Sequence, residues 1–212
     1  MALIEEELKI VNIKELLNKK LVLPSYQRPY CWSSQSTNTL FLDTYGAFKE
    51  GINEYRLGSV ILHKEMNGKC ANYNIVDGQQ RLTTLSILFY CLGDLSQSLL
   101  QEKYSKLSND AIVTNFRILA KRIGELDKEE LEDYKDYLMN QCTVVQIVID
   151  SEQEAFQFFD SQNSRGKELD PHDLLKSYHL REMVNDDEQV KMKIIKRWED
   201  LNQNDLRDLF KN

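Results

Sequence analysis

The sequence predicts a small β-sheet with a large helical complement, an α+β or α/β mixture dominated by helix. Three short runs rich in β-branched residues, at 57–65, 72–76 and 143–149, have the composition of strands. Much of the remaining chain repeats apolar residues at helical spacing. The 212 residues include only 3 Pro and 8 Gly, so long disordered linkers are not expected.

The N-terminal part combines a helical pattern with an extended segment. Residues 4–20 carry helical periodicity, although "LKIVNI" within them also fits a short strand. Pro24 and Pro29 of "LVLPSYQRPYCW" keep that segment extended or turning. Residues 36–50 are expected to form a short amphipathic helix.

The central part predicts a hairpin followed by helices. Asn67-Gly68 between the first two strand-like runs is a strong signal for a tight hairpin turn. A helix is expected to begin at Gln79 and to turn its leucines toward the core. Apolar stripes within 112–126 and 131–138 predict further helices.

The C-terminal part begins with "TVVQIVI" (143–149), which predicts a buried strand. "SEQEAFQFFDSQ" then returns to helical spacing, and "NSRGKEL" is expected to be a loop. Asp170 and Pro171 suit the N-cap and first position of another helix, and 187–201 predicts a last one.

Composition limits the classes of function. A net charge of -7 argues against a chain that coats DNA along its whole surface. The four cysteines are scattered and include no CxxC pair, so we expect reduced cysteines in a cytoplasmic protein. No apolar run approaches the ~20 residues of a membrane span. The acidic N-terminus lacks the layout of a signal peptide.

The stretch "VDGQQRLTTL" predicts an anion-binding turn. A strand that feeds a helix through a tight turn leaves the first helical N–H groups unpaired, and the helix dipole favours phosphate there. Gly78 allows close approach of a ligand, and Arg81 adds positive charge. The alternative interpretation is that Asp77 caps the helix while Gln79 and Gln80 face water.

A second segment, "PSYQRPYCW", interleaves aromatic residues with an arginine. Tyr26, Gln27 and Arg28 suit stacking on a base or covering a ligand. The alternative is that Tyr30 and Trp32 of the same segment are core anchors.

A third segment, at 158–178, places polar and cationic residues in and after a loop. Gly166 permits an unusual backbone angle, and cations here could converge on an anion. The polar and cationic candidates are Asn163, Arg165 and Lys176. The alternative is a helix–turn–helix connection with solvated charges. Together with the segments above, the cations available for a triphosphate pocket are Arg28, Arg81, Arg165 and Lys176.

Four blocks together resemble the N-terminal domain of GmrSD-type restriction endonucleases, a family marked by a DGQQR motif. In the family's order they are "LPSYQRPYCW", "LGSVIL", "YNIVDGQQRLTTL" and "FFDSQNSRGKELDPHDLLKSY". The resemblance implies a ParB/sulfiredoxin-like α+β core with helical additions. It also implies binding and hydrolysis of a nucleoside triphosphate, in a domain that regulates a nuclease acting on modified phage DNA.

The resemblance carries these roles onto residues of this chain. It implies nucleotide binding by Tyr26, Gln27, Arg28, Gly78, Arg81, Asn163, Arg165 and Gly166, and Lys176 is added as a nearby cation. Asp77 is expected to hold Mg²⁺ or to orient an attacking water, with Gln79 and Gln80 assisting in catalysis.

The expected organisation is a nucleotide-binding domain at 1–180 and a helical extension at 181–212 that begins a longer parent protein. The expected partners are a nucleotide and an HNH-type nuclease module, in cis or as a separate subunit, with DNA contacted indirectly and no membrane. No nuclease activity is expected from these 212 residues alone. The alternative function is a non-hydrolysing, nucleotide-switched module of ParB-like type that binds DNA or protein.

Overall fold

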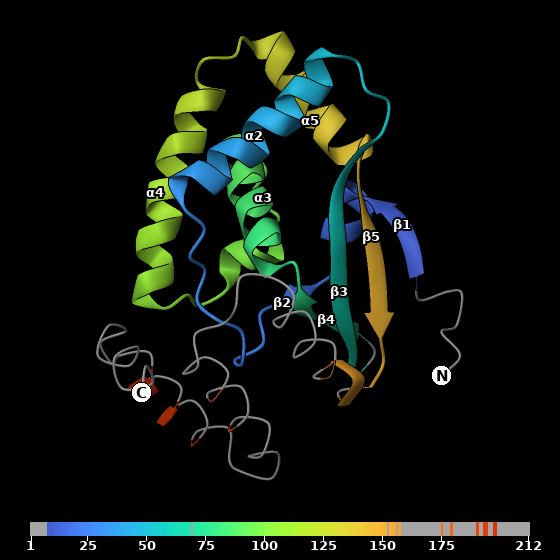
Figure 1. The fold of residues 1–212 in the computed structure, drawn as a ribbon, viewed down its shortest axis with the longest axis vertical. Coiled ribbons are helices and arrows are strands. Elements are labelled where there is room, and N and C mark those ends of the chain that lie inside the picture. The colour runs from blue at the N-terminus through green and yellow to red at the C-terminus, as the bar shows by residue number, and fades with distance from the viewer. Residues whose placement is uncertain are drawn as a thin grey trace, which may run out of the picture. The chain divides into compact units, whose positions relative to one another are not determined.

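The computed structural model (Figure 1) describes residues 8–68, 70–151 and 153–155, and eight positions further on: Gln157, Leu175, His179, Val190, Lys193, Ile194, Arg197 and Trp198. The chain divides into two compact units. One comprises Met1–Leu23 and Pro29–Phe156, and the other Pro24–Arg28 and Gln157–Asn212. All the helices and strands given below belong to the first unit. The predicted division between residues 180 and 181 lies outside the described residues and stays a prediction.

A five-stranded mixed sheet in the order β1-β5-β3-β4-β2 forms one layer of the first unit. The strands are β1 (Leu8–Asn12), β2 (Leu21–Val22), β3 (Tyr55–Asn67), β4 (Cys70–Asp77) and β5 (Cys142–Ile149). β3 pairs with β4 antiparallel and with β5 parallel. β1 pairs with β5 antiparallel, and β2 pairs with β4 parallel. The predicted α+β fold with a small sheet is confirmed.

Turn and strand signals in the sequence correspond to observed features. The predicted hairpin is confirmed, with Gly68 at a positive φ of 63° in its turn. β5 is the predicted buried strand, and its Val144 lies fully buried opposite Val11 of β1. Residues 4–20 combine both alternatives, because Asn12 ends β1 and its side chain accepts a 2.8 Å hydrogen bond from the Glu15 N–H.

The helices form the second layer, and Figure 1 shows α2 to α5 on one side of the sheet. They are α1 (Ile13–Leu17), α2 (Ser34–Lys49), α3 (Gln79–Cys91), the 3₁₀ turn η1 (Ser98–Gln101), α4 (Lys106–Ile123) and α5 (Lys128–Asn140). The predicted start of α3 at Gln79 is confirmed. Within the described part of the chain, no helix is long and apolar enough to span a membrane.

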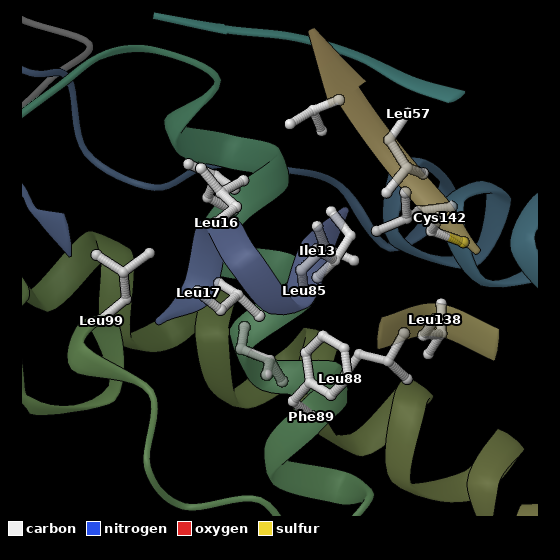
Figure 2. Close-up of a cluster of buried hydrophobic side chains, with 14 of the residues drawn as sticks. Ile13, Leu16, Leu17, Leu57, Leu85, Leu88, Phe89, Leu99, Leu138 and Cys142 are labelled. Atoms are coloured by element: carbon white, nitrogen blue, oxygen red, sulfur yellow. The ribbon is translucent and has the colours of Figure 1, made fainter. Parts of the chain in front are cut away.

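The core lies between the sheet and these helices, and Figure 2 shows the meeting of side chains from α1, α3, α5, η1, β3 and β5. Leu85, Leu88 and Phe89 of α3 are fully buried there. Burial of one such side chain contributes about 1.5–3 kcal/mol to stability. The core therefore fixes the axis of α3 and, with it, the position of the first turn of that helix.

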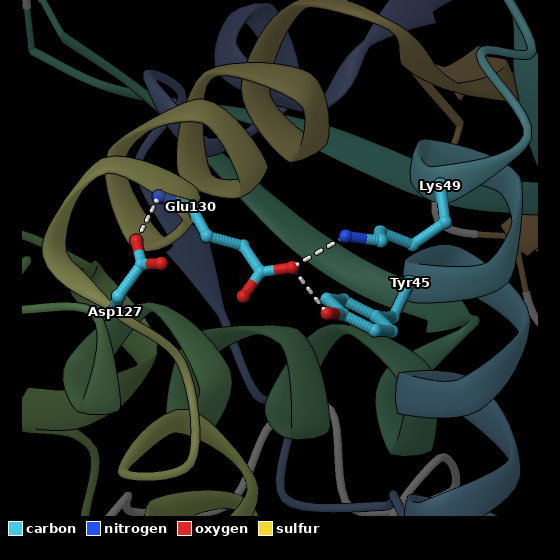
Figure 3. Close-up of polar contacts among 4 residues, drawn as sticks. All are labelled: Tyr45, Lys49, Asp127 and Glu130. Atoms are coloured by element: carbon cyan, nitrogen blue, oxygen red, sulfur yellow. Dashed lines mark hydrogen bonds and ion pairs between the residues drawn. The ribbon is translucent and has the colours of Figure 1, made fainter.

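The start of α5 is tied to α2 by polar contacts (Figure 3). The Asp127 side chain accepts a 2.9 Å hydrogen bond from the Glu130 N–H and caps the helix. Glu130 in turn accepts hydrogen bonds from Lys49 Nζ, at 2.7 Å, and from the Tyr45 hydroxyl. The Glu130 N–H at the start of α5 is thus satisfied by a side chain of the protein itself.

Candidate functional site

The turn between β4 and α3 requires a glycine. Gly78 is the N-cap of α3 and has a left-handed φ of 93°, which side-chain-bearing residues rarely adopt. A Cβ atom at this position would lie 3.1 Å from Cγ2 of Val60 and 3.5 Å from the Ser59 carbonyl oxygen. The turn therefore packs its backbone directly against β3.

Gly78, the N-cap of α3, makes no side-chain capping hydrogen bond. Asp77 is the last residue of β4, where it pairs with Ile61, and the first-turn residues Gln79 and Gln80 are only 6% and 8% exposed. The alternative interpretation, in which Asp77 caps the helix and both glutamines face water, is therefore wrong. The first turn of an α-helix is a common site for anion binding, because its N–H groups have no partner within the helix.

Arg81 lies in this first turn with its guanidinium held against β3. Its Nη1 donates a 2.9 Å hydrogen bond to the Ser59 carbonyl, and the guanidinium lies beside the Cα of Gly58. Burial lowers the pKa of Arg81 and the charge of Asp77 raises it, and the guanidinium stays protonated at neutral pH. The ion pairs found among the described residues do not include Arg81.

Gln80 anchors a distant segment to the first turn of α3. Its Oε1 accepts hydrogen bonds from the Cys31 N–H at 2.8 Å and the Trp32 N–H at 3.1 Å. Its Nε2 donates to the Pro29 carbonyl at 3.2 Å. Both polar atoms of the side chain are thus engaged by backbone. The predicted catalytic role of Gln80 has no direct support in these contacts and stays a prediction.

The same segment is held by a buried polar network that the sequence interpretation missed. Tyr30 is fully buried, its N–H donates to Ser108 Oγ at 2.9 Å, and its hydroxyl contacts Thr84 Oγ1 at 2.8 Å. Asn115 Nδ2 donates to the Tyr30 hydroxyl and to the Trp32 carbonyl. Tyr30 is therefore a core anchor, as the alternative interpretation of this segment proposed. The signal in the sequence was Thr84, a polar residue between core leucines.

The remaining predicted residues fall outside this turn. Tyr26, Gln27 and Arg28 belong to the second unit, where the Gln27 N–H donates to the Pro24 carbonyl at 3.1 Å. Asn163, Arg165, Gly166 and Lys176 lie outside the described residues. Convergence of the predicted cations on one pocket therefore stays a prediction.

Two irregularities in the sheet flank the turn, and neither was predicted. The pairing of β3 with β5 shifts register between Arg56 and Ser59, and the pairing of β3 with β4 shifts between Ile61 and Leu62. Such bulges bend a strand and re-aim its groups, and they occur often beside functional sites. The only signal in the sequence was the isolated glycine of "LGSVIL", a position at which a bulge is common.

The chemistry of the turn suits a phosphate group better than a protein-bound metal cluster. Among the described residues no group of three or more His, Cys, Asp or Glu side chains could hold a metal ion. Asp77 alone can supply one carboxylate ligand, which fits Mg²⁺ because that ion usually keeps waters and phosphate oxygens as further ligands. A cavity of about 330 Å³ between α1 and α5 shares no residue with the turn.

Comparison with known proteins agrees with these observations. The sequence model of the N-terminal domain of GmrSD restriction endonuclease matches residues 13–180, which is most of the chain and includes the β4–α3 turn. No curated protein sequence matches the chain. The chain belongs to the family of GmrSD restriction endonuclease N-terminal domains.

Proposed function

We propose that this domain binds a nucleoside triphosphate at the β4–α3 turn and hydrolyses it, and that this reaction regulates a nuclease module. One observation carries the proposal: a glycine N-cap that makes no side-chain capping bond and a partly buried arginine occur in the same helical turn. Burial lowers the pKa of Arg81 even though the charge of Asp77 raises it, so burial costs the charged guanidinium more than Asp77 offsets. A bound anion would offset part of that cost.

The phosphate groups are the part of the ligand that this turn fits. Backbone N–H groups at a helix N-terminus, together with the helix dipole, bind phosphate. The glycine backbone of Gly78 permits close approach, and the planar guanidinium of Arg81 can donate two hydrogen bonds to one phosphate. The proposal assigns base contacts to Tyr26, Gln27 and Arg28, and further phosphate contacts to Asn163, Arg165, Gly166 and Lys176.

For hydrolysis the proposal assigns chemistry to Asp77 and Gln79. Asp77 is suited to hold Mg²⁺, which would neutralise phosphate charge, or to orient a water for attack on the terminal phosphorus. Gln79 begins α3 close to Asp77 in sequence, and the proposal assigns it an assisting role in catalysis. Gln80 enters as a positioning residue, because its polar atoms hold Pro29, Cys31 and Trp32.

The proposed partner is an HNH-type nuclease module, in the same polypeptide or as a separate subunit. The net charge of -7 disfavours extensive direct contact with DNA, so the nuclease module is the expected DNA-binding component.

Thermal unfolding with ATP, GTP, CTP, UTP and inorganic triphosphate, each with and without Mg²⁺, tests binding. A ligand present at a hundred times its dissociation constant adds about 2.7 kcal/mol to stability. Arg81→Ala should weaken binding about 10- to 100-fold, since hydrogen bonds to charged groups contribute about 1.5–3 kcal/mol. Arg117→Ala, an exposed change on α4, is the matched control. Equal affinity in a folded Arg81→Ala variant would refute the assignment.

Release of inorganic phosphate separates hydrolysis from the alternative of a nucleotide-switched binding module. Steady release that is abolished in Asp77→Asn, with nucleotide still bound, would support hydrolysis. Binding without release in the unmodified chain, at any nucleotide and Mg²⁺ concentration, would favour the switch.

A further inference from the structure

We propose that Gly58, at the β3 bulge, is a positioning residue that orients Arg81 toward the bound anion. This inference rests on the proposed function. It assigns a role to the "LGSVIL" segment of β3, which is distant in sequence from the DGQQR motif.

The contact between Gly58 and Arg81 is too close for a side chain unless the guanidinium shifts. A Cβ atom at Gly58 would lie 3.1 Å from Nη1, 3.1 Å from Nη2 and 3.2 Å from Cζ of Arg81. Because both terminal nitrogens are equally distant from this atom and slightly closer than Cζ, it would sit above the guanidinium plane, at the edge formed by Nη1 and Nη2. The planar group therefore lies against the bare Cα of Gly58.

The backbone around Gly58 is shaped for this contact. Gly58 has a positive φ of 108°, and it lies where the pairing of β3 with β5 shifts register. The next carbonyl, that of Ser59, accepts the 2.9 Å hydrogen bond from Nη1. The Nη1–Nη2 end of the guanidinium is thus held by two consecutive residues of β3, and the proposal assigns the N–H groups not bonded to Ser59 to the ligand.

Fixing the side chain in advance favours binding. A free arginine side chain has about 2 kcal/mol of rotamer entropy, which is lost when it orders around a ligand. Because β3 already holds the guanidinium, less of that loss falls on the binding step. The same geometry explains the choice of arginine, since an ammonium group has no flat face to lie on Gly58 and no second nitrogen to offer.

The test is isothermal titration of the whole chain with inorganic triphosphate and with ATP. Gly58→Ala should weaken binding at least about tenfold, which equals about 1.4 kcal/mol. Gly93→Ala is the matched control, because Gly93 also has a positive φ, 80°, but a Cβ there would meet nothing within 4 Å. That control should bind within about twofold of the unmodified chain.

Gly58→Ala and Gly93→Ala are then made in an Arg81→Lys background. This comparison separates a positioning role of Gly58 from a general disruption of the site. If Gly58 acts through the guanidinium, Gly58→Ala should lose most of its effect once the guanidinium is gone. An equal effect in both backgrounds, or none in the first, would overturn the inference. If Gly58→Ala alone does not fold, folding restored by Arg81→Lys would support the steric coupling, and failure in both would overturn it.

These outcomes are distinct from failure of the proposed function. If the unmodified chain binds neither triphosphate nor ATP, the proposed function fails and the inference fails with it. If the unmodified chain binds and Gly58→Ala binds equally well, only the role of Gly58 is refuted.

Discussion

The helices α3 and α5 begin in opposite ways. α5 starts with Asp127 as a capping side chain, and the acidic residues Glu129 and Glu130 follow in its first turn. α3 starts with Gly78, has no capping side chain and no acidic residue, and carries Arg81 instead. At α5 the capping residue and the first turn carry the negative charge that a helix N-terminus favours, whereas at α3 the only neighbouring acid among the described residues is Asp77, which precedes the N-cap.

The two helix starts are expected to differ in purpose: the start of α5 contributes to stability, and the start of α3 also contributes to ligand binding. The α5 start is closed, because Glu130 also contacts Lys49 and Tyr45 of α2. The α3 start is anchored by the hydrogen bonds of Gln80 and by the core, and its N-cap residue, Gly78, makes no side-chain capping bond. Changes at α5 should therefore reduce stability alone, and changes at α3 should divide between anchoring and ligand affinity.

The largest expected effect is on the anchor of α3. Gln80→Ala removes three hydrogen bonds to the backbone of the 29–32 segment. At about 1 kcal/mol each, the free energy of unfolding should fall by about 3 kcal/mol. Urea denaturation measures this, with Gln101→Ala at an exposed site as the control. A loss no greater than that of the control would show that water replaces the glutamine without cost.

A smaller effect is expected from opening the start of α5. Asp127→Ala should lower the free energy of unfolding by about 1 kcal/mol, the usual value for a lost N-cap. Nucleotide affinity should not change, because the cap contacts only its own helix. Asp133→Ala, an exposed acid within α5, controls for the change in net charge. A weaker affinity in the Asp127 variant alone would break the contrast between the two helices.

The smallest expected effect is the loss, at acid pH, of the stability that Glu130 contributes. Hydrogen bonds from Lys49 and then Tyr45 lower the pKa of Glu130 below its ordinary 4.5. Its stabilising effect is therefore present above that value and is lost as the pH falls through the lower, folded-state pKa. The difference in melting temperature between the unmodified chain and Glu130→Gln should be constant from about pH 6 to 8 and shrink below about pH 4.5. A constant difference down to pH 3 would mean that the charge contributes nothing.

Local signals in the sequence predicted most of the fold. The Asn67-Gly68 hairpin, the start of α3 at Gln79 and the buried strand β5 each depend on a few neighbouring residues. Residues 4–20 remained ambiguous because a five-residue strand and a five-residue helix follow one another there. The two-residue strand β2 was missed, since Leu21–Val22 has no pattern long enough to indicate a strand.

The site was predicted only in part, because its contacts are distant in sequence. Gln80 looked solvent-facing by its place in the first turn, but residues 48 to 51 positions earlier in the chain cover it. The contact between Arg81 and Gly58 depends on a register shift between β3 and β5. No local pattern in the sequence predicts that shift. The DGQQR motif identified the position of the turn in the sequence. The contacts of its Arg81 side chain depend on the neighbouring strand β3.

Because Gln80 accepts hydrogen bonds from two backbone amides of a distant segment, hydrogen exchange at those amides can report on the first turn of α3. The N–H groups of Cys31 and Trp32 are bonded to the first turn of α3, although 49 and 48 positions separate them from Gln80. An amide proton exchanges with solvent only while its hydrogen bond is open. A ligand that keeps the turn closed should therefore slow deuterium uptake at 31 and 32. Occupancy of the turn can then be followed at a segment that carries no label and no substitution.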